Sequence, residues 1–473
     1  MSTSEVCGIA MFLCNYNIAI NSYSIILLER SHSIEFSNHP TFAAHASIVV
    51  GLIMGIIVFG FSNYAVYRLT ISLRICSCLL VLGGILSITT GYLPWSVNSR
   101  KLLEFAIARF IVGIGCGGLC SSVSLIFKDS CAKPIDNCKL AFIYGPIGSL
   151  GLLAAPLIVG IFDQWKISAD GITWKVALSV GTIPGILLLP YHVDNTFNDH
   201  INQKNDYNGD HSFIVRSQRM LETIFEQIPN IFSNTTLKSY LFGTYTSFMC
   251  FDAIFYGNFL VIVRVVDHLF LKTAYNPSSF WRISVVGANC GLFFWLGGWF
   301  SVIGLRHISA MAIQLHGFIL MSGAFILLAV IKLFSNEECC LFLMLTYSFM
   351  FLFAGFGPAP MTYLMPGILF PGSLKTPLDG LMAIWGKIGA VVGILLSHYF
   401  YVEIATLMIV FSAFSLLGAG STLIILNAKF TDRKGQYDGY SLVGSHGFEQ
   451  ENLCVTLAHT DSHAENNMTL SSV

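Results

Sequence analysis

Residues 103–127 have the sequence LEFAIARFIVGIGCGGLCSSVSLIF, which is long and apolar enough to form a helix across a membrane. A helix needs roughly 17–25 residues to cross about 30 Å of hydrocarbon. Gly113, Gly115 and Gly117 recur at every second position of the run, and small residues of this kind allow a neighbouring helix to approach closely. We expect these glycines to have a structural or gating role. The stretch therefore predicts a membrane helix that packs tightly inside a bundle.

The glycines of this run also match part of a dinucleotide-binding loop. That loop requires a preceding β-strand and a following amphipathic helix. The residues on both sides of the glycines continue the same apolar window instead. The dinucleotide interpretation is therefore excluded.

Eleven more windows of this length and apolarity occur in the chain, which favours an all-α polytopic membrane protein. Six of the twelve precede a polar stretch and six follow it, so we predict two pseudo-symmetric six-helix bundles. The windows are 6–28, 46–67, 72–93, 103–127, 139–162, 174–192, 239–264, 281–304, 309–333, 339–364, 380–402 and 405–427. The expected domains are an N-terminal bundle (1–192), a cytoplasmic linker with a short amphipathic helix (193–238), a C-terminal bundle (239–427) and a disordered cytoplasmic tail (428–473).

The composition excludes several other classes of protein. Of the 473 residues, 54% are hydrophobic and only 11% are charged, and the mean hydropathy is +0.69. An average soluble domain has roughly a quarter charged residues, so water cannot be the main solvent of this surface. The net charge of −1 offers no basic field for nucleic acid. We expect a multi-pass protein of the plasma membrane or an organelle membrane that acts as a monomer in the lipid bilayer.

Metal and enzyme chemistry find no support in the residue pattern. The 13 cysteines are scattered, many of them within apolar windows, and none has metal or redox spacing with a nearby histidine. We interpret them as small buried apolar residues. A Ser-His-Asp arrangement, a zinc-protease motif and a phosphate-loop lysine are all missing from the sequence. We therefore expect no enzyme activity, no metal and no cofactor.

Lysine and arginine set the expected orientation. Their excess lies in the segments that are cytoplasmic when both chain termini are placed in the cytoplasm, as the positive-inside rule requires. An even number of helices leaves both termini on one side. We therefore predict two cytoplasmic termini.

The two predicted bundles carry matching irregular features. The glycine run of the fourth window has a counterpart in the tenth, Gly355-Phe356-Gly357-Pro358, and we expect Gly357 and Pro358 to act in structure or gating. Asn17 of the first window has its counterpart in the polar cluster of the seventh. Interrupted or polar helices at corresponding positions of two repeats indicate a transporter site near the middle of the membrane.

Charges at membrane depth are the strongest site candidates, because each costs about 2.5–3.5 kcal/mol on insertion scales. Asp252 and Tyr256 are four residues apart on one face of the seventh window. Lys387 lies well inside the eleventh window and is the natural partner of Asp252 or of an anionic substrate. The alternatives are that Asp252 caps a broken helix or pairs for packing only, and that the Lys387 side chain extends to the membrane interface.

Other intramembrane polar residues have a structural interpretation. We interpret Arg109 mainly as an anchor between helices, with ligand contact as the alternative. Gln314, His316, Asn289 and Tyr347 are expected to form hydrogen bonds between helices.

Three stretches of the second half resemble signatures of a known transporter family. Residues 251–257, FDAIFYG, are similar to the LDIAFYG signature of the phosphate:proton symporters. Residues 356–371 are similar to that family's FGPN…PGExFP signature, and 380–390 to its HGISAASGKxGA signature. With twelve windows and the 109–117 run, the chain resembles this branch of the major facilitator superfamily. The resemblance implies the fold of that superfamily.

The resemblance also implies which residues bind substrate. Asp252, Tyr256 and Lys387 match positions of the phosphate and proton pathway. Other matched positions carry different residues. Two acidic residues of the family's first helix fall on Cys14 and Asn17, its fifth-helix glutamine on Tyr144, its GPN asparagine on Ala359, and its tryptophan on Phe248.

The expected function is secondary transport of a small anion, with inorganic phosphate as the first candidate substrate and protons as the candidate coupling ion. We expect the substrate at Asp252, Tyr256, Lys387, Phe248, Asn17 and Tyr144. Because the N-terminal positions have lost their carboxylates, a sugar or organic-solute carrier, or a uniporter, is the first alternative. A transport-inactive membrane receptor or scaffold is the second.

Overall fold

A computed structural model describes most of the chain at the level of individual residues. The described residues are 3–32, 38–66, 69–90, 98–128, 134–164, 170–190, 229, 233–266, 280–334, 340–370, 372–400 and 403–440. The predicted amphipathic helix of the linker and most of the predicted tail lie outside these residues, and both remain predictions. Two compact units divide the chain at Leu426, and the following paragraphs concern the first, Met1–Leu426.

The described residues are almost entirely helical, and a helix lies at each of the twelve predicted windows. The helices of the N-terminal half are α1 (Thr3–His32), α2 (Asn38–Val66), α3 (Leu69–Thr89), α4 (Asn98–Lys128), α5 (Pro134–Phe142), η1 (Ile143–Ile147), α6 (Gly148–Gln164) and α7 (Asp170–Ile186). Those of the C-terminal half are α10 (Thr235–Phe259), α11 (Ile262–Val266), α12 (Phe280–Gly304), α13 (Ala310–Phe334), α14 (Cys340–Phe356), α15 (Pro358–Leu369), α16 (Gly372–Phe400) and α17 (Ile404–Tyr440). The predicted all-α fold class is confirmed.

Ten of these helical segments are long and apolar enough to cross a membrane. The remaining two predicted spans are α7, whose apolar part Ile172–Ile186 is shorter, and α10, which contains Asp252 among several hydroxyl and amide side chains. Large apolar side chains such as Leu103 (60% exposed) and Leu333 (62% exposed) cover the outer faces of the helices. Such a surface is solvated by lipid, so the chain is a multi-pass integral membrane protein.

Two of the spans are interrupted by proline. The fifth span changes from α5 to the short π-helix η1, which contains Pro146, before it continues as α6. The tenth span breaks at Gly357, and Pro358 then begins α15. Proline has no backbone N–H and cannot continue the hydrogen-bond ladder of a helix, so each proline coincides with a change in helical path. The predicted irregularity of the tenth span is therefore present.

Glycines bring corresponding helices of the two halves into backbone contact. In the N-terminal half, a Cβ atom added to Gly113 would lie 2.9 Å from the Cα atom of Gly51 on α2. In the C-terminal half, a Cβ atom added to Gly355 of α14 would overlap the carbonyl oxygen of Phe294 on α12. Helices in lipid associate mainly through such close packing. The same close packing at glycine therefore joins α2 to α4 in the N-terminal half and α12 to α14 in the C-terminal half.

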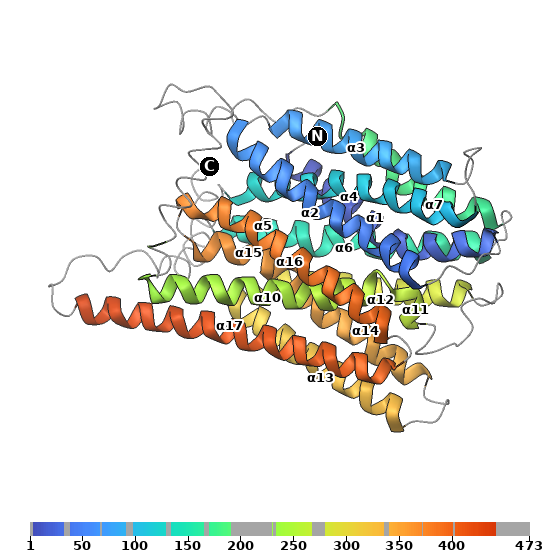
Figure 1. Ribbon diagram of the computed structural model, residues 1–473. Coiled ribbons are helices and arrows are strands. Elements are labelled where there is room, and N and C mark those ends of the chain that lie inside the picture. Colours follow the sequence, from blue (N-terminus) through green and yellow to red (C-terminus); the bar gives the residue numbers. More distant parts are fainter. Residues whose placement is uncertain are drawn as a thin grey trace, which may run out of the picture. The chain divides into compact units, whose positions relative to one another are not determined.

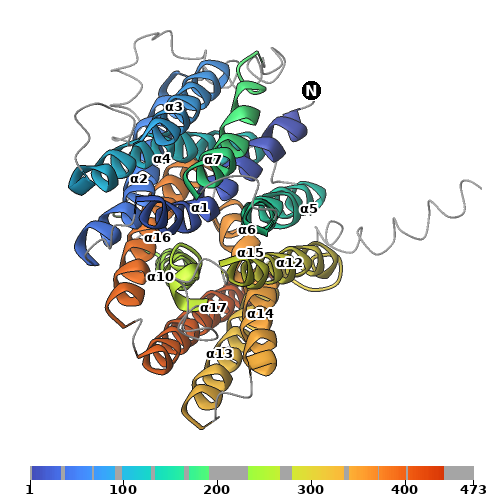
Figure 2. The same ribbon diagram turned by 90° about the vertical axis from the view of Figure 1, so that its right-hand side faces the viewer.

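Several pairs of helices join the halves to each other, and two of them make the most extensive contacts. α2 of the N-terminal half packs on α16 of the C-terminal half, and α6 packs on α12 (Figures 1 and 2). Within the C-terminal half, α10 packs along α16. These contacts bring α16, which carries Lys387, next to α2 of the N-terminal half, and place α10, which carries Asp252, beside α16.

The last helix is longer than the sequence predicts. α17 continues to Tyr440, whereas the predicted window ends at residue 427. The second compact unit begins at Asn427, and its described part is the end of this helix.

Candidate functional site

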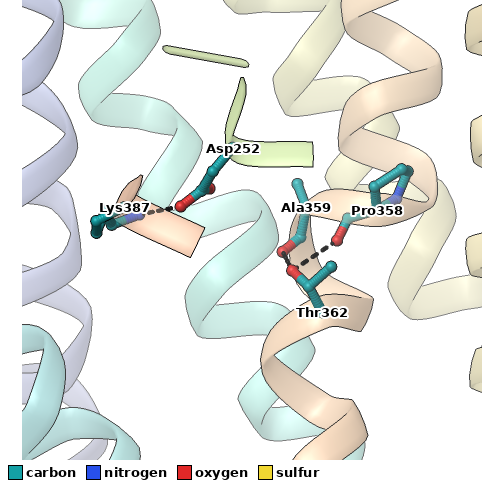
Figure 3. Close-up of polar contacts among 5 residues, drawn as sticks. All are labelled: Asp252, Pro358, Ala359, Thr362 and Lys387. Carbon is teal, nitrogen blue, oxygen red and sulfur yellow. Dashed lines mark hydrogen bonds and ion pairs between the residues drawn. The ribbon is translucent and has the colours of Figure 1, made fainter. Parts of the chain in front are cut away.

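An ion pair between Asp252 and Lys387 lies at the centre of the candidate site. The Lys387 Nζ atom lies 2.7 Å from Oδ2 of Asp252, and the two side chains are only 5% and 1% exposed (Figure 3). Asp252 comes from the middle of α10 and Lys387 from the middle of α16. The buried pair excludes the alternative that the lysine side chain extends to the membrane interface. It leaves open whether the pair binds substrate or serves packing only.

Two glycines of α16 allow the pair to form. A Cβ atom on Gly389 would overlap the backbone carbonyl of Met249, and one on Gly393 would overlap that of Ala253. Both contacts are with α10, on either side of Asp252 along that helix. The two backbones therefore approach closely enough for the short Asp252 side chain to reach Lys387.

Aromatic rings enclose the ammonium group of Lys387. Its Nζ atom lies 4.5 Å from the centre of the Tyr256 ring and 5.8 Å from that of Phe248, both within range of a cation–π interaction. The ring of Tyr363 on α15 contacts Phe248 edge-on at 5.1 Å. Tyr144 of η1 stacks on Tyr363 at 4.2 Å. The predicted residues Tyr256, Phe248 and Tyr144 are thus brought together with the ion pair.

Thiols of the N-terminal half lie near the ion pair and Tyr256. Cys14 of α1 lies with its Sγ atom 3.5 Å from the carbonyl oxygen of Cys116 on α4. Cys120, one turn further along α4, is within electrostatic range of both Asp252 and Lys387. Within the described segments, no group of three His, Cys, Asp or Glu side chains could hold a metal ion.

Asn17 and Arg109 lie in a separate polar cluster. The Asn17 side chain donates hydrogen bonds to the carbonyl oxygens of Leu13 and Gly181, each at 3.0 Å, and accepts one from Nη1 of Arg109 at 3.5 Å. Arg109 also donates from Nε and Nη2 to Oγ of Ser87, at 3.2 and 3.1 Å. Arg109 therefore joins α4 to α1 and α3. The structure does not bring Asn17 into contact with the ion pair.

The remaining predicted residues lie where helices pack on one another. Gly113 and Gly117 face α2, whereas Gly115 faces α3. Gly357 approaches Gly317 of α13. The carbonyl of Pro358 accepts a hydrogen bond from Thr362 Oγ1 at 2.9 Å, beside the site in Figure 3.

The expected hydrogen bonds between helices are present for two of four residues. Asn289 of α12 donates to Oγ of Ser348 on α14 at 2.6 Å, and the Tyr347 hydroxyl of α14 donates to Asn258 of α10 at 3.4 Å. His316 instead contacts the carbonyl of Ala312 within its own helix. Gln314 is fully buried, and its side-chain amide has no hydrogen-bond partner among the described residues. The expectation was therefore wrong for His316 and Gln314.

Two contacts of the site were not expected from the sequence. One is Tyr363, which is one aromatic residue among many in its window and carries no local signal. The other is a hydrogen bond from Ser124 Oγ of α4 to Oδ2 of Asp379 on α16, at 2.6 Å. Asp379 precedes the Gly380–Ala390 stretch that resembles a family signature, and this position was the available signal.

The Ser124–Asp379 hydrogen bond joins the two halves at the membrane side from which α1 begins. We predict that Ser124→Ala weakens the contact between the two halves at this side and so makes it open more often. The reason is that removing the hydroxyl removes a charge-assisted bond of about 1.5–3 kcal/mol. Alkylation of a cysteine introduced near the start of α16 should become several-fold faster in the variant. An unchanged alkylation rate would rule out a closing role. Ser121→Ala is a matched control, because Ser121 bonds only the carbonyl of Gly117 in its own helix among the described contacts.

Comparisons with known proteins show what the sequence and the fold are similar to. A family model described as "Sugar (and other) transporter" matches residues 5–192. The chain is 21% identical over 399 residues to the inorganic phosphate transporter PT2 of Toxoplasma gondii, covering 82% of this chain and 64% of that protein. It is 22% identical over 416 residues to the inorganic phosphate transporter PHO84 of Saccharomyces cerevisiae, covering 74% and 69%. The chain thus spans just under two thirds of the first of these relatives.

Solved structures define the class of fold. The proton:xylose symporter XylE bound to 6-bromo-6-deoxy-D-glucose matches with a TM-score of 0.67 at 14% identity, covering 88% of this chain and 93% of that one. A partially occluded inward-open form of XylE from E. coli matches with a TM-score of 0.62 at 15% identity, covering 88% and 96%. The fold of this chain is that of the major facilitator superfamily. The sequence is similar to proteins named inorganic phosphate transporters, as its signature stretches predict.

Proposed function

We propose that the protein is a secondary transporter that moves a small anion by alternating access, with inorganic phosphate as the first candidate. The observation that carries this proposal is the buried ion pair between Asp252 and Lys387. A charge pair at membrane depth is expensive to maintain and typically marks a transport pathway. The similarity to proteins named inorganic phosphate transporters supports phosphate as the substrate.

The chemistry of the pair provides a mechanism for coupling. An anion that approaches Lys387 competes with Asp252 for the ammonium group. Once Asp252 loses that partner, its buried carboxylate binds a proton more readily, because burial disfavours the charged form. Substrate and proton would therefore be bound together and released together. Binding then shifts the equilibrium between the two open states through differential contacts.

Uptake into proteoliposomes tests this function. We expect radiolabelled phosphate to accumulate when the outer solution is more acidic than the lumen, and accumulation to fall to background in Lys387→Gln. Lys332→Gln, at the end of α13, is a matched control that should retain uptake. Uptake without dependence on the proton gradient would indicate a uniporter. No uptake of phosphate by the wild-type protein would contradict phosphate as the substrate.

A sugar or organic solute is the second candidate, and the stacked rings of Tyr144 and Tyr363 favour it. Flat aromatic faces beside a few polar groups are typical of binding sites for uncharged or weakly charged ligands. Labelled xylose and glucose in the same liposomes distinguish the two candidates. Absence of uptake and of thermal stabilisation for all of these solutes would favour a receptor or scaffold.

Orientation and assembly complete the proposal. We propose that both termini are cytoplasmic, so that Ser124 and Asp379 lie on the cytoplasmic side, and that the protein acts as a monomer in the plasma membrane or an organelle membrane. The distribution of Lys and Arg supports this orientation.

A further inference from the structure

Arg109 is a buried cation whose hydrogen-bond partners in the described structure are all neutral. Arg109 belongs to α4, and its side chain is fully buried. The guanidinium donates to the hydroxyl of Ser87 and to the amide oxygen of Asn17, and its Cζ atom lies 5.6 Å from the centre of the Phe105 ring. A hydroxyl, an amide and an aromatic ring solvate a cation without neutralising it. Buried charges in proteins are normally paired with an opposite charge.

The two hydrogen-bonding neighbours satisfy only part of this group. The Asn17 amide oxygen accepts one bond, from Nη1, and the Ser87 hydroxyl oxygen accepts two, from Nε and Nη2. The Ser87 hydroxyl donates to the carbonyl of Gly83 at 2.7 Å. A guanidinium has five N–H groups, and only three nitrogen–oxygen contacts are formed in the described structure. Donors therefore remain for an additional acceptor.

Arg109 differs in this respect from Lys387. The charge of Lys387 is neutralised by Asp252 at 2.7 Å, whereas no described ion pair neutralises Arg109. These three buried side chains together therefore carry one net positive charge. A single bound negative charge would neutralise them, so the site suits a monovalent anion.

The position of Arg109 on α4 connects it with the ion pair. Cys116 and Cys120 follow at seven and eleven residues, spacings that place them on the same helix face as Arg109. Seven residues correspond to about 10 Å along a helix. Cys120 is within electrostatic range of Lys387, and Cys116 within that of Arg109. One face of α4 therefore leads from Arg109 toward the ion pair.

We propose that Arg109, held by Asn17 and Ser87, is a second anion-binding position of this protein and takes a small monovalent oxyanion. The planar fork of a guanidinium matches two oxygens of such an ion. The identification of this anion with the transported one rests on the proposed function, whereas binding at Arg109 does not. Because its charge is not neutralised by a carboxylate, Arg109 attracts the anion before Lys387 has to leave Asp252.

The test is thermal unfolding of the full chain in lipid nanodiscs, with inorganic phosphate titrated at constant ionic strength and at pH 6. We expect phosphate to raise the unfolding temperature of the wild-type protein. In Arg109→Gln, the concentration needed for half of this rise should increase at least tenfold. An unchanged phosphate response in Arg109→Gln would overturn the proposal.

A second variant keeps the test decisive if Arg109→Gln folds poorly. Asn17→Asp supplies an internal carboxylate at the oxygen that Arg109 already contacts. It should raise the unfolding temperature without phosphate and abolish the further rise with phosphate. A wild-type response in Asn17→Asp would also overturn the proposal. Asn289→Asp is the matched control, because its amide bonds Ser348 rather than a cation, and it should keep the phosphate response.

Uptake measured on the same preparations separates the two proposals. Phosphate binding that depends on Arg109 in a protein without uptake supports the anion position and contradicts the transport function. Uptake in a protein whose phosphate binding is independent of Arg109 overturns the anion position alone.

Discussion

Asp252→Asn is expected to abolish transport and to destabilise the protein by about 3–5 kcal/mol. The reason is that the variant leaves the Lys387 ammonium group buried without its counter-charge, and removing one partner of a buried ion pair has a cost of this size. The pair is almost inaccessible to solvent, so water cannot replace the lost carboxylate in the closed protein. The unfolding temperature and uptake in proteoliposomes measure the two effects.

A double variant separates stability from function. Asp252→Asn combined with Lys387→Met removes both charges and leaves none unpaired. We expect it to recover most of the lost stability, because neutral replacements of buried ion pairs are often tolerated. It should still show no uptake. If the double variant transports normally, the pair serves packing only and the site assignment is wrong.

Gly393→Val is expected to have the second largest effect. The added side chain would overlap the carbonyl of Ala253 and force α16 away from α10. Overpacking of this kind costs about 1–3 kcal/mol, and more where the obstacle is backbone that cannot rearrange. Because the displaced contact is next to the ion pair, the distance between Lys387 and Asp252 should also increase. We expect loss of uptake together with a lower unfolding temperature.

A glycine with free space around it provides the control for this variant. Gly323 of α13 has no atom within 4 Å of an added Cβ. Gly323→Ala should be neutral or stabilise the protein by up to about 1 kcal/mol, because alanine has the higher helix propensity. A Gly393→Val variant as stable and active as Gly323→Ala would show that α10 and α16 do not need their close contact.

The fold could be predicted from sequence because lipid imposes simple rules on length and apolarity. A window of about 20 apolar residues is a helix in a bilayer, since every backbone group must be hydrogen-bonded within its own segment. The windows therefore located even α10, whose polar residues lower its apolarity. The end of α17 was missed, because outside the bilayer the sequence after residue 427 is polar and lacks the same constraint.

The ion pair could be predicted, whereas most of its surroundings could not. Charges at membrane depth are rare and therefore conspicuous, and Asp252 and Lys387 are natural partners by sign. Tyr363 is one aromatic ring among many, and only tertiary packing brings it onto Tyr144 and Phe248. Asn17 matched a site position by its place in the sequence, but its hydrogen bonds connect it to Arg109 instead. Which residues of a helix face the site depends on the rotation of that helix about its axis. An apolar window does not specify this rotation.

The location of both charges in one half of the protein has a consequence for the unloaded state of the proposed transporter. Asp252 and Lys387 belong to α10 and α16, which pack on each other within the C-terminal half. Rigid rocking of one half against the other leaves their separation unchanged, so the pair remains neutral whichever side is open. The ion pair itself therefore adds no unpaired charge that opposes the return of the unloaded protein. In the proposed transporter, the ion pair is therefore no obstacle to net uptake without exchange of one solute for another.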